Sequence, residues 1–458
     1  MNNAFLLVGF SRIDITPDDS VPLAGYGNTS FRMSQNILDP ITFTAIALTD
    51  KNDNTVLLCT VDLINVFTDK TKILRENISK ATGVKKEQII IDATHTHSGP
   101  DAYTIDMDCM INFYDKYFDL AVECAKSALA DRAPATMMIG RTNTNKLNFI
   151  RHYFAEDGSP VSDNHDARKS TDIPIVKHAT EVNSTMHLIK FVRNGVSGEV
   201  CGVSPQDKKD VVLINWRAHG TKTGGGKKYD VSADYPYPLR KFVEQDAGVL
   251  CAYFQGEAGN VNPQSRIAEE RTDPDYMVYG RQLADVALNG LKDLHEVPQG
   301  TIKHSVEKFT YNVNHAFEDI MDIVHETQRI WRETNSSKAT KEFCMPYGIF
   351  SPYHANAIAN RSHLPATSDC ELNVMLISNV AFAFAPFEVF DTLGMIIKEN
   401  SKYTETLVMG YSCESRGYLP SKIAYEYGCY EADCTKMAEG TGEKVAEKLV
   451  QMINNIKN

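Results

Sequence analysis

The segment EQIIIDATHTHSGP, residues 87–100, joins an apolar run to a polar end that contains two histidines. The run "QIIID" has the continuous apolar character of a buried strand. Residues two apart on a strand project from the same face, so His95 and His97 are expected to project together from its carboxyl end. Functional sites of α/β sheets assemble at such strand ends. The pair therefore indicates a metal site, an acid–base pair or only a polar strand end.

Strands and helices alternate around this segment. Residues 41–64 form two β-rich runs about a polar turn, which predicts a hairpin. Residues 69–82 have helical spacing, and Gly83 stands where that helix should end. A helix at about 113–130 and a strand at about 134–142 then predict a βαβ-type region.

The rest of the chain continues this alternation. Asn194-Gly195 between β-rich arms predicts a second hairpin over 186–202, and the apolar run 211–220 predicts a strand that ends on a histidine. Residues 154–175 are predicted to form a long polar loop at the surface. Further helices are expected at 274–293, 315–335, 389–399 and 434–456, and further strands at 301–313, 371–379 and 380–388. We therefore expect one large α/β (mixed α+β) domain over residues 1–458, with mixed sheets flanked by helices.

Composition limits the class of partner. The net charge of the 458 residues is −12 and no basic cluster is present, which argues against nucleic acid and anionic membranes. The N-terminal sequence lacks the basic segment and cleavage site of a signal peptide, and no segment has the about 20 apolar residues that span a bilayer. The ten scattered cysteines fit reduced thiols, with Cys429 and Cys434 as a weak metal candidate. We expect a cytoplasmic protein with a small-molecule substrate and no stable membrane insertion; the oligomeric state stays open.

Three other segments each place a potential metal ligand after a predicted strand. They place His219 in "INWRAHG", Glu388 in "FAPFEVF" and Tyr418 in "ESRGYLP". Imidazoles and a carboxylate suit zinc, and a coordination position left for water makes such a site catalytic. The alternatives are a solvated strand end for His219 and, for Glu388, a carboxylate at a helix N-terminus. Tyrosine is a rarer ligand than either.

Six motifs in order resemble the catalytic domain of the neutral ceramidases, over about residues 7 to 450. They are VGFSRIDITP, ATHTHSGP, NWRAH, QGEAGNVNP, APFE and GYLPSKIAYEYGCYE. The resemblance implies a neutral-ceramidase-like fold with a single catalytic zinc, held by His95, His219, Glu388 and Tyr418. The immunoglobulin-like C-terminal domain of full-length ceramidases has no counterpart in the sequence.

The same resemblance implies roles for three substrate-side residues. His97 would hold the substrate carbonyl or its oxyanion, Arg151 in "LNFIRHY" would lie beside the substrate, and Tyr430 would donate to the developing oxyanion. The alternatives are a surface arginine at Arg151 and a buried structural tyrosine at Tyr430.

The sequence departs from the family at the nucleophile. Ceramidases carry a serine in a Gly-Asp-Val-Ser-Pro run, whereas this chain has Gly259-Asn260-Val261-Asn262-Pro263. An amide side chain cannot form the covalent acyl intermediate. Zinc lowers the pKa of bound water from about 15.7 to about 7, so the expectation is attack by this water while Asn262 donates to the substrate. The alternatives are an inactive protein and a turn residue before Pro263.

The loop 221–230, TKTGGGKKYD, bears on the substrate. It contains three glycines together with Lys222, Lys227 and Lys228, but it lacks the P-loop pattern. The loop is either a solvated connector or a cover over the site, and as a cover it would favour a polar group on the substrate. We expect a zinc-dependent hydrolase of an amide, ester or lactone bond in a small polar substrate, a class that includes anionic and carbohydrate-derived molecules. The alternatives are a metal-dependent isomerase or lyase on a sugar-like substrate and a non-catalytic ligand-binding protein.

Overall fold

Two sheets stack face to face at the centre of the structure. The computed structural model describes residues 3–26, 32–101, 107–162, 173–224 and 227–456. A nine-stranded sheet has the order β14-β12-β11-β6-β1-β3-β4-β5, with β16 paired to β6. Its strands are β1 (Leu6–Asp14), β3 (Thr42–Asp50), β4 (Thr55–Val61), β5 (Ile89–Ala93), β6 (Ala133–Asn143), β11 (Thr185–Val192), β12 (Val211–Trp216), β14 (Leu250–Gln255) and β16 (His295–Glu296).

The second sheet has four strands in the order β17-β18-β19-β21. These are β17 (Ile302–Asn312), β18 (Thr367–Ile377), β19 (Val380–Phe384) and β21 (Glu405–Met409). Only the pairs β4–β5, β12–β14 and β19–β21 are parallel within the two sheets among the described residues. One buried apolar cluster contains side chains from both sheets, among them Ile46, Phe254 and Phe382, so the sheets bury their inner faces against each other.

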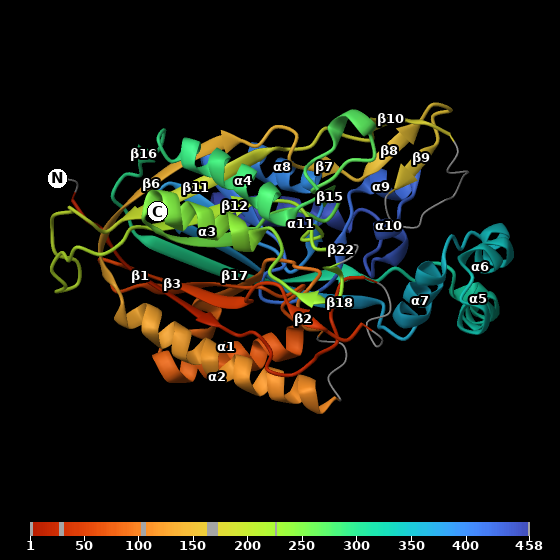
Figure 1. Cartoon of the computed structure of the whole chain (residues 1–458), viewed down its shortest axis with the longest axis horizontal. Coiled ribbons are helices and arrows are strands. Elements are labelled where there is room, and N and C mark those ends of the chain that lie inside the picture. The colour runs from red at the N-terminus through yellow and green to blue at the C-terminus, as the bar shows by residue number, and fades with distance from the viewer. Residues whose placement is uncertain (1–2, 27–31, 102–106, 163–172, 225–226, 457–458) are drawn as a thin grey trace.

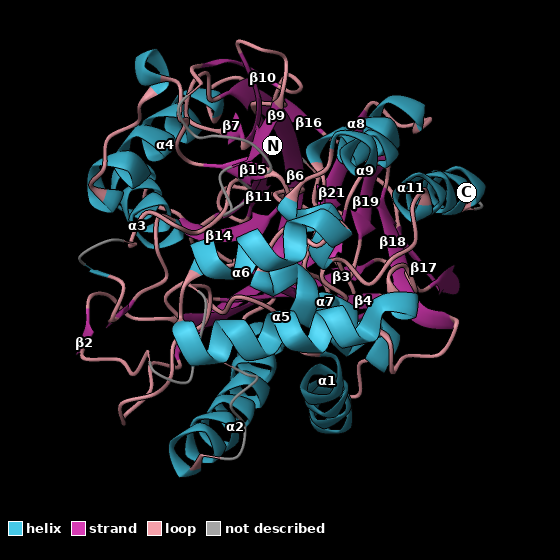
Figure 2. Cartoon of the chain, turned by 90° about the vertical axis from the view of Figure 1, so that its right-hand side faces the viewer, coloured by secondary structure: helices cyan, strands magenta, loops and turns pink. Residues whose placement is uncertain are grey.

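Helices cover the outer faces of both sheets, as Figure 2 shows with α1 and α2 below, α3 and α4 at one side and α8 and α11 at the other. Separate apolar clusters lie beneath the three pairs, so the core has four layers. The covering helices are α1 (Thr68–Thr82), α2 (Asp108–Ala130), α3 (Pro236–Ala247), α4 (Tyr276–Gly290), α8 (Asp391–Asn400) and α11 (Thr441–Asn455).

Shorter elements gather at one end of the sheets, where β5, β12, β14 and β19 terminate (Figure 1). They are β2 (Asn36–Ile37) with β13 (Asp230–Val231), β7 (Phe149–Ile150) with β15 (Val261–Asn262), β20 (Glu388–Val389) with β22 (Tyr418–Leu419), and the sheet of β8 (His152–Ala155), β9 (Pro160–Ser162) and β10 (Ile175–His178). The helices α9 (Lys422–Tyr427) and α10 (Tyr430–Cys434) lie at the same end. Every sequence motif that ends in a candidate ligand is thereby brought to one edge.

A group of helices projects beyond this end, at the right of Figure 1. It consists of α5 (Met321–Thr334), α6 (Ser337–Cys344) and α7 (Pro352–Arg361) and has a small apolar core of its own around Val324 and Ile358. The sequence predicted α5 within 315–335 but not α6 and α7, which have only 8 and 10 residues.

Most of the predicted elements are confirmed, and so is the mixed α/β class. The strands of 41–64 pair antiparallel, and Gly83 ends α1 in a left-handed conformation with φ of 76°. The hairpin over 186–202 is wrong. Residues 196–202 form no strand, because β11 is already flanked by β6 and β12 and has no free edge. The last helix begins at Thr441 instead of 434, because Gly440 has a left-handed backbone conformation with φ of 79° that a continuous helix does not allow.

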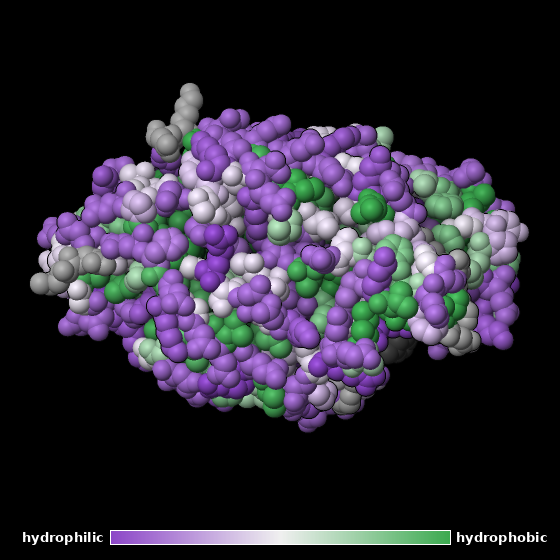
Figure 3. Space-filling model, turned by 90° about the horizontal axis from the view of Figure 1, so that it is seen from above, coloured by the Kyte–Doolittle hydropathy of each residue, from purple (hydrophilic) through white to green (hydrophobic). Residues whose placement is uncertain are grey.

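Of the predicted surface loop 154–175, residues 163–172 lie outside the described part of the chain. The remainder contributes to β8, β9 and β10. None of the described helices has the length and apolar character that crossing a bilayer would require. In the view of Figure 3, polar residues cover most of the face and the apolar residues form small separate patches.

The contact between β1 and α2 gives a test of the packing. A Cβ at Gly9 would collide with the carbonyl oxygen of Ala128 and lie 2.8 Å from the backbone nitrogen of Arg132. We therefore predict that Gly9→Ala lowers the free energy of unfolding by about 1–3 kcal/mol, because backbone must move to admit the methyl group. Urea denaturation measures the loss. Ser11→Ala on the same strand is the control, and an equal loss in both variants would contradict this packing.

Candidate metal centre

His95 stands two residues after the end of β5 and is held in an unusual backbone conformation. Its φ is 62°, in the left-handed region that few non-glycine residues adopt. The side chain is 2% exposed, and Nδ1 lies 2.7 Å from the carbonyl oxygen of Ile64. Since a carbonyl can only accept, Nδ1 carries the proton and the lone pair is on Nε2.

His219 repeats this arrangement at the end of β12. It is buried, and its Nδ1 lies 3.1 Å from the carbonyl oxygen of Val261, which also accepts from the His219 backbone amide at 2.9 Å. A histidine whose Nδ1–H is bound to a carbonyl presents Nε2 in the tautomer and orientation that metal ligation requires. Both predicted histidine ligands therefore have the hydrogen bond typical of metal-binding imidazoles.

Glu388 brings a carboxylate to the same point. Its Oε2 lies 3.4 Å from His95 Nε2 and 3.6 Å from His219 Nε2. This oxygen is buried and has no hydrogen-bond partner among the residues that the structure describes. Burial raises the pKa of the Glu388 carboxyl, although His95 and Arg151 act in the opposite direction. An orphaned buried carboxylate oxygen beside two Nε2 atoms fits a bound cation.

His97 completes a cluster of three imidazoles. Its Nε2 lies 3.2 Å from His95 Nε2, and nitrogens of His95, His97 and His219 lie within 4.8 Å of one another. The ring packs on Gly25, where an added Cβ would be 2.5 Å from the His97 Cβ, and against the ring of Tyr26 at 5.3 Å.

The protonation states of the three histidines suit metal binding. Burial lowers the pKa of His95 to about 3 and those of His97 and His219 well below the ordinary histidine value, and neighbouring cations act in the same direction. All three imidazoles are therefore neutral at neutral pH, as ligation demands.

Tyr418 lies beside the cluster through strand pairing. It stands opposite Glu388 in the parallel register of β20 and β22, and its hydroxyl hydrogen-bonds with the Glu388 carboxyl and the Arg151 guanidinium. The Tyr430 ring packs edge-on against the Tyr418 ring, with 5.9 Å between the ring centroids. Asn262 pairs with Phe149, directly after the Val261 carbonyl that holds His219.

Arg151 is fixed by a second buried cluster. Its guanidinium lies 3.1 Å from His219 Nε2, donates to the Gly259 carbonyl at 2.9 Å and forms an ion pair with Glu431. His152 lies 2.8 Å from the other Glu431 oxygen and 2.8 Å from the Tyr427 hydroxyl. Burial alone would raise the pKa of Glu431, but Arg151 and His152 hold it well below its ordinary value.

The second cluster contains a further group of potential ligands, His152, Cys429 and Glu431. Both nitrogens of His152 are already hydrogen-bonded and Glu431 carries the Arg151 cation, so this group positions Arg151 and is a poor metal site. Sequence reasoning did not identify Glu431 or His152. The available signal was adjacency, because they directly follow Tyr430 and Arg151.

The lysines of the loop 221–230 do not converge on the imidazoles. The Lys222 ammonium donates to the Thr272 hydroxyl at 2.5 Å and to the Asp273 carbonyl at 2.7 Å. That of Lys227 lies 3.8 Å from Asp275, and that of Lys228 lies over the ring of Tyr229. Gly225 and Gly226 are outside the described residues. The loop charge therefore gives no support to an anionic substrate.

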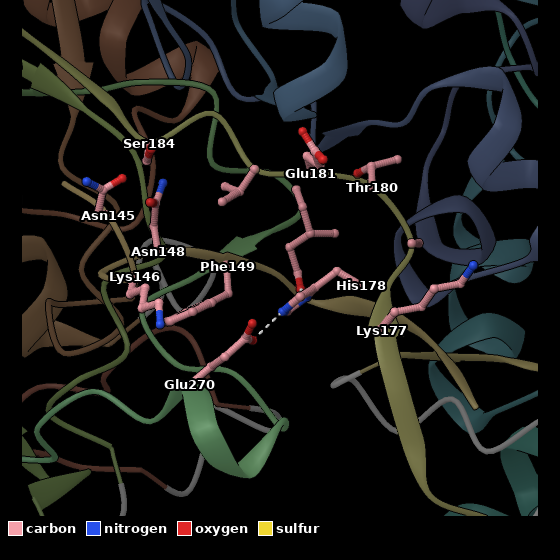
Figure 4. A pocket seen from close by; sticks show the side chains of 13 residues that line it. Asn145, Lys146, Asn148, Phe149, Lys177, His178, Thr180, Glu181, Ser184 and Glu270 are labelled. Carbon is pink, nitrogen blue, oxygen red and sulfur yellow. Dashed lines mark hydrogen bonds and ion pairs between the residues drawn. The ribbon is translucent and has the colours of Figure 1, made fainter. Parts of the chain in front are cut away.

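A cavity of about 680 Å³ opens beside β7 and β10 (Figure 4). Its walls include His178, whose Nδ1 lies 2.6 Å from the Ile150 carbonyl and whose Nε2 lies 2.6 Å from Glu270. None of the eight predicted site residues lines this cavity, although Ile150 directly precedes Arg151. It is a space distinct from the imidazole cluster.

Comparisons with known proteins identify the fold. No model of a protein family and no curated protein sequence matches the chain. Among solved structures, the neutral ceramidase from Pseudomonas aeruginosa superposes with a TM-score of 0.72 at 16% identity, over 99% of this chain and 74% of that one. A ceramidase complexed with C2 gives a TM-score of 0.71 at 14% identity, over 100% and 77%. The chain has the neutral ceramidase fold. At this identity the likeness establishes the architecture, so the chemistry of this neutral-ceramidase-like chain must be argued from its own residues.

The buried Arg151–Glu431 pair gives a test of the site. We predict that Glu431→Gln lowers the free energy of unfolding by about 3–5 kcal/mol, because it leaves the Arg151 cation buried without a counter-charge. Guanidinium denaturation measures the loss. Glu326→Gln, which breaks an exposed ion pair with Arg329, is the control and should change little. Equal losses would show that the Arg151–Glu431 pair is solvated.

Proposed function

We propose that the chain is a zinc-dependent hydrolase that cleaves an amide, ester or lactone bond in a small polar substrate, including carbohydrate-derived molecules. One observation carries the proposal. Two buried histidines, each with Nδ1 bound to a carbonyl oxygen, present Nε2 to the same unpartnered carboxylate oxygen of Glu388.

The donor set suits zinc, the metal that the sequence resemblance implies. His95, His219 and Glu388 would hold it, with the phenol oxygen of Tyr418 as a fourth ligand beside Glu388. Two imidazoles, a carboxylate and a phenol oxygen are donors that suit zinc. When bound, zinc supplies Lewis acidity and lowers the pKa of water so that hydroxide is available near pH 7.

The remaining residues orient the substrate. His97 lies next to His95 and is neutral, so its N–H can donate to a carbonyl oxygen. The Arg151 guanidinium is fixed by Glu431 and the Gly259 carbonyl and provides a positive charge for a developing oxyanion. Burial raises the pKa of Tyr430 well above its ordinary value, which keeps its hydroxyl a donor.

The residues at the family's nucleophile position favour direct hydrolysis over a covalent route. Asn262 can donate through its amide but cannot be acylated. Asn260 has a structural contact, because its Oδ1 accepts from the backbone amide of Asp391 at 2.9 Å. The net charge of −12 supports a small-molecule substrate instead of nucleic acid.

Metal content tests the proposal. Purified protein should contain about one zinc per chain by mass spectrometry, and His219→Ala should lose both the metal and the activity while the fold persists. The control is His178→Ala, which removes an imidazole with similar carbonyl and carboxylate contacts outside the cluster. A zinc-free protein that still turns over substrate would refute the assignment.

Product masses separate the alternative functions. Hydrolysis adds the mass of water, whereas a metal-dependent isomerase leaves the mass unchanged and a lyase divides it without water. A non-catalytic binding protein would show stabilisation by ligand with no turnover.

The role of Asn262 has its own test. If its amide donates to the oxyanion, Asn262→Ala should lower kcat about 100-fold, as loss of one such donor does, while zinc content is retained. Steady-state kinetics with zinc analysis measures both. An unchanged kcat would show that Asn262 serves only the turn before Pro263.

A further inference from the structure

Each of three segments that carry the proposed site also sends one charged side chain into a common buried cluster. Arg217 precedes His219 by two residues, Glu257 precedes Gly259 by two residues, and Asp391 follows Glu388 by three. Arg217 and Glu257 are 0% exposed and Asp391 is 1% exposed. Charged residues are almost never buried so completely unless they are paired, so each of these three side chains needs a partner of opposite charge.

The three side chains are joined by ion pairs. Arg217 Nε lies 3.3 Å from Glu257 Oε2, and Arg217 NH1 lies 3.7 Å from Asp391 Oδ1. Lys398 of α8 forms a close ion pair with the other Glu257 oxygen. Asn183 bridges the cluster from outside, since its carbonyl accepts from Arg217 at 2.5 Å and its amide donates to Asp391 at 2.9 Å. Two cations and two anions therefore balance.

The backbone between this cluster and the proposed site is continuous. The Gly259 amide donates to the Val389 carbonyl at 2.8 Å, and the Asp391 amide donates to Asn260 at 2.9 Å. The His219 amide donates to Val261 at 2.9 Å. Only one to four residues separate each buried charge from a group that faces the site, so a shift of one segment is transmitted to the others.

Helix α8 is shaped to admit the Glu257 carboxylate. A Cβ at Gly394 would collide with Glu257 Cγ and lie 2.6 Å from its Oε1. Burying four charges is costly, and well-packed apolar residues often replace them without loss of stability. These charges lie directly behind three segments of one site, which indicates that they are needed to hold those segments in a fixed geometry.

We propose that Arg217, Glu257 and Asp391 are positioning residues that clamp the segments of His219, Asn262 and Glu388 in the arrangement the site needs. The clamp itself rests on the contacts above. Its importance for hydrolysis rests on the proposed function.

Hydrogen–deuterium exchange and zinc competition titrations test the clamp in the full-length protein. The variants are Glu257→Gln and Asp391→Asn, which remove a charge, and Gly394→Ala, which displaces Glu257 while favouring the helix. Each should raise exchange about tenfold or more in 217–221, 256–263 and 386–392 together. Each should also weaken zinc binding about 10- to 100-fold, as loss of groups that position metal ligands does.

Asp131→Asn is the matched control, because Asp131 also pairs with a buried arginine and a lysine, Arg193 and Lys208. It should raise exchange only near its own contacts and leave zinc affinity unchanged. If the clamp variants change exchange only in α8, or uniformly over the whole chain, the proposal is wrong. Gly394→Ala and Asp391→Asn decide the matter if Glu257→Gln does not fold.

The two proposals fail in different ways. If the variants show coupled exchange but the wild-type protein binds no zinc, the clamp is supported and the proposed hydrolase function is wrong. Zinc binding and turnover that are unchanged in all three variants, without coupled exchange, would remove the clamp alone.

Discussion

Two hydrogen bonds, from His95 Nδ1 to the Ile64 carbonyl and from His219 Nδ1 to the Val261 carbonyl, determine what the site can do. They fix the tautomer of both rings, so that both unprotonated Nε2 atoms lie within 3.6 Å of Glu388 Oε2. The two rings meet although β5 and β12 stand far apart in the strand order, because β14, the neighbour of β12, contacts β5: the Gln255 amide donates to the Asp92 carboxylate at 3.0 Å. The stacking of the sheets then brings Glu388, after β19, to the two rings.

The sequence predicted most of the strands well, because a buried strand leaves a local signal, and it named ligand candidates that stay predictions. Apolar runs such as "QIIID" indicate buried strands, and ligands that follow strands indicate a shared edge. The hairpin at Asn194-Gly195 was wrong because a turn signal is local, whereas strand pairing depends on which edges remain free. The helices α6 and α7 were missed because segments of 8 and 10 residues contain only about two to three turns in which helical periodicity can be detected.

Contacts between distant residues were beyond sequence reasoning. Nothing near Arg151 indicates that Glu431, 280 positions later, carries its counter-charge, nor that Arg217, Glu257 and Asp391 meet. Such charges can be buried only in partnership, so their positions in the sequence indicate nothing until the fold pairs them. The fold of the neutral ceramidases is present at 14–16% identity, so the likeness establishes architecture and leaves the chemistry to the residues of this chain.

Anomalous diffraction at the zinc absorption edge, from crystals grown with zinc, tests the central claim most directly. The account predicts one strong peak within about 2.0–2.2 Å of His95 Nε2, His219 Nε2 and a Glu388 carboxylate oxygen, the distances of zinc to nitrogen and oxygen ligands. The same map would show whether Tyr418 or His97 provides a further ligand. A peak at His152, Cys429 and Glu431 instead, or none at the imidazole cluster with zinc in excess, would contradict it.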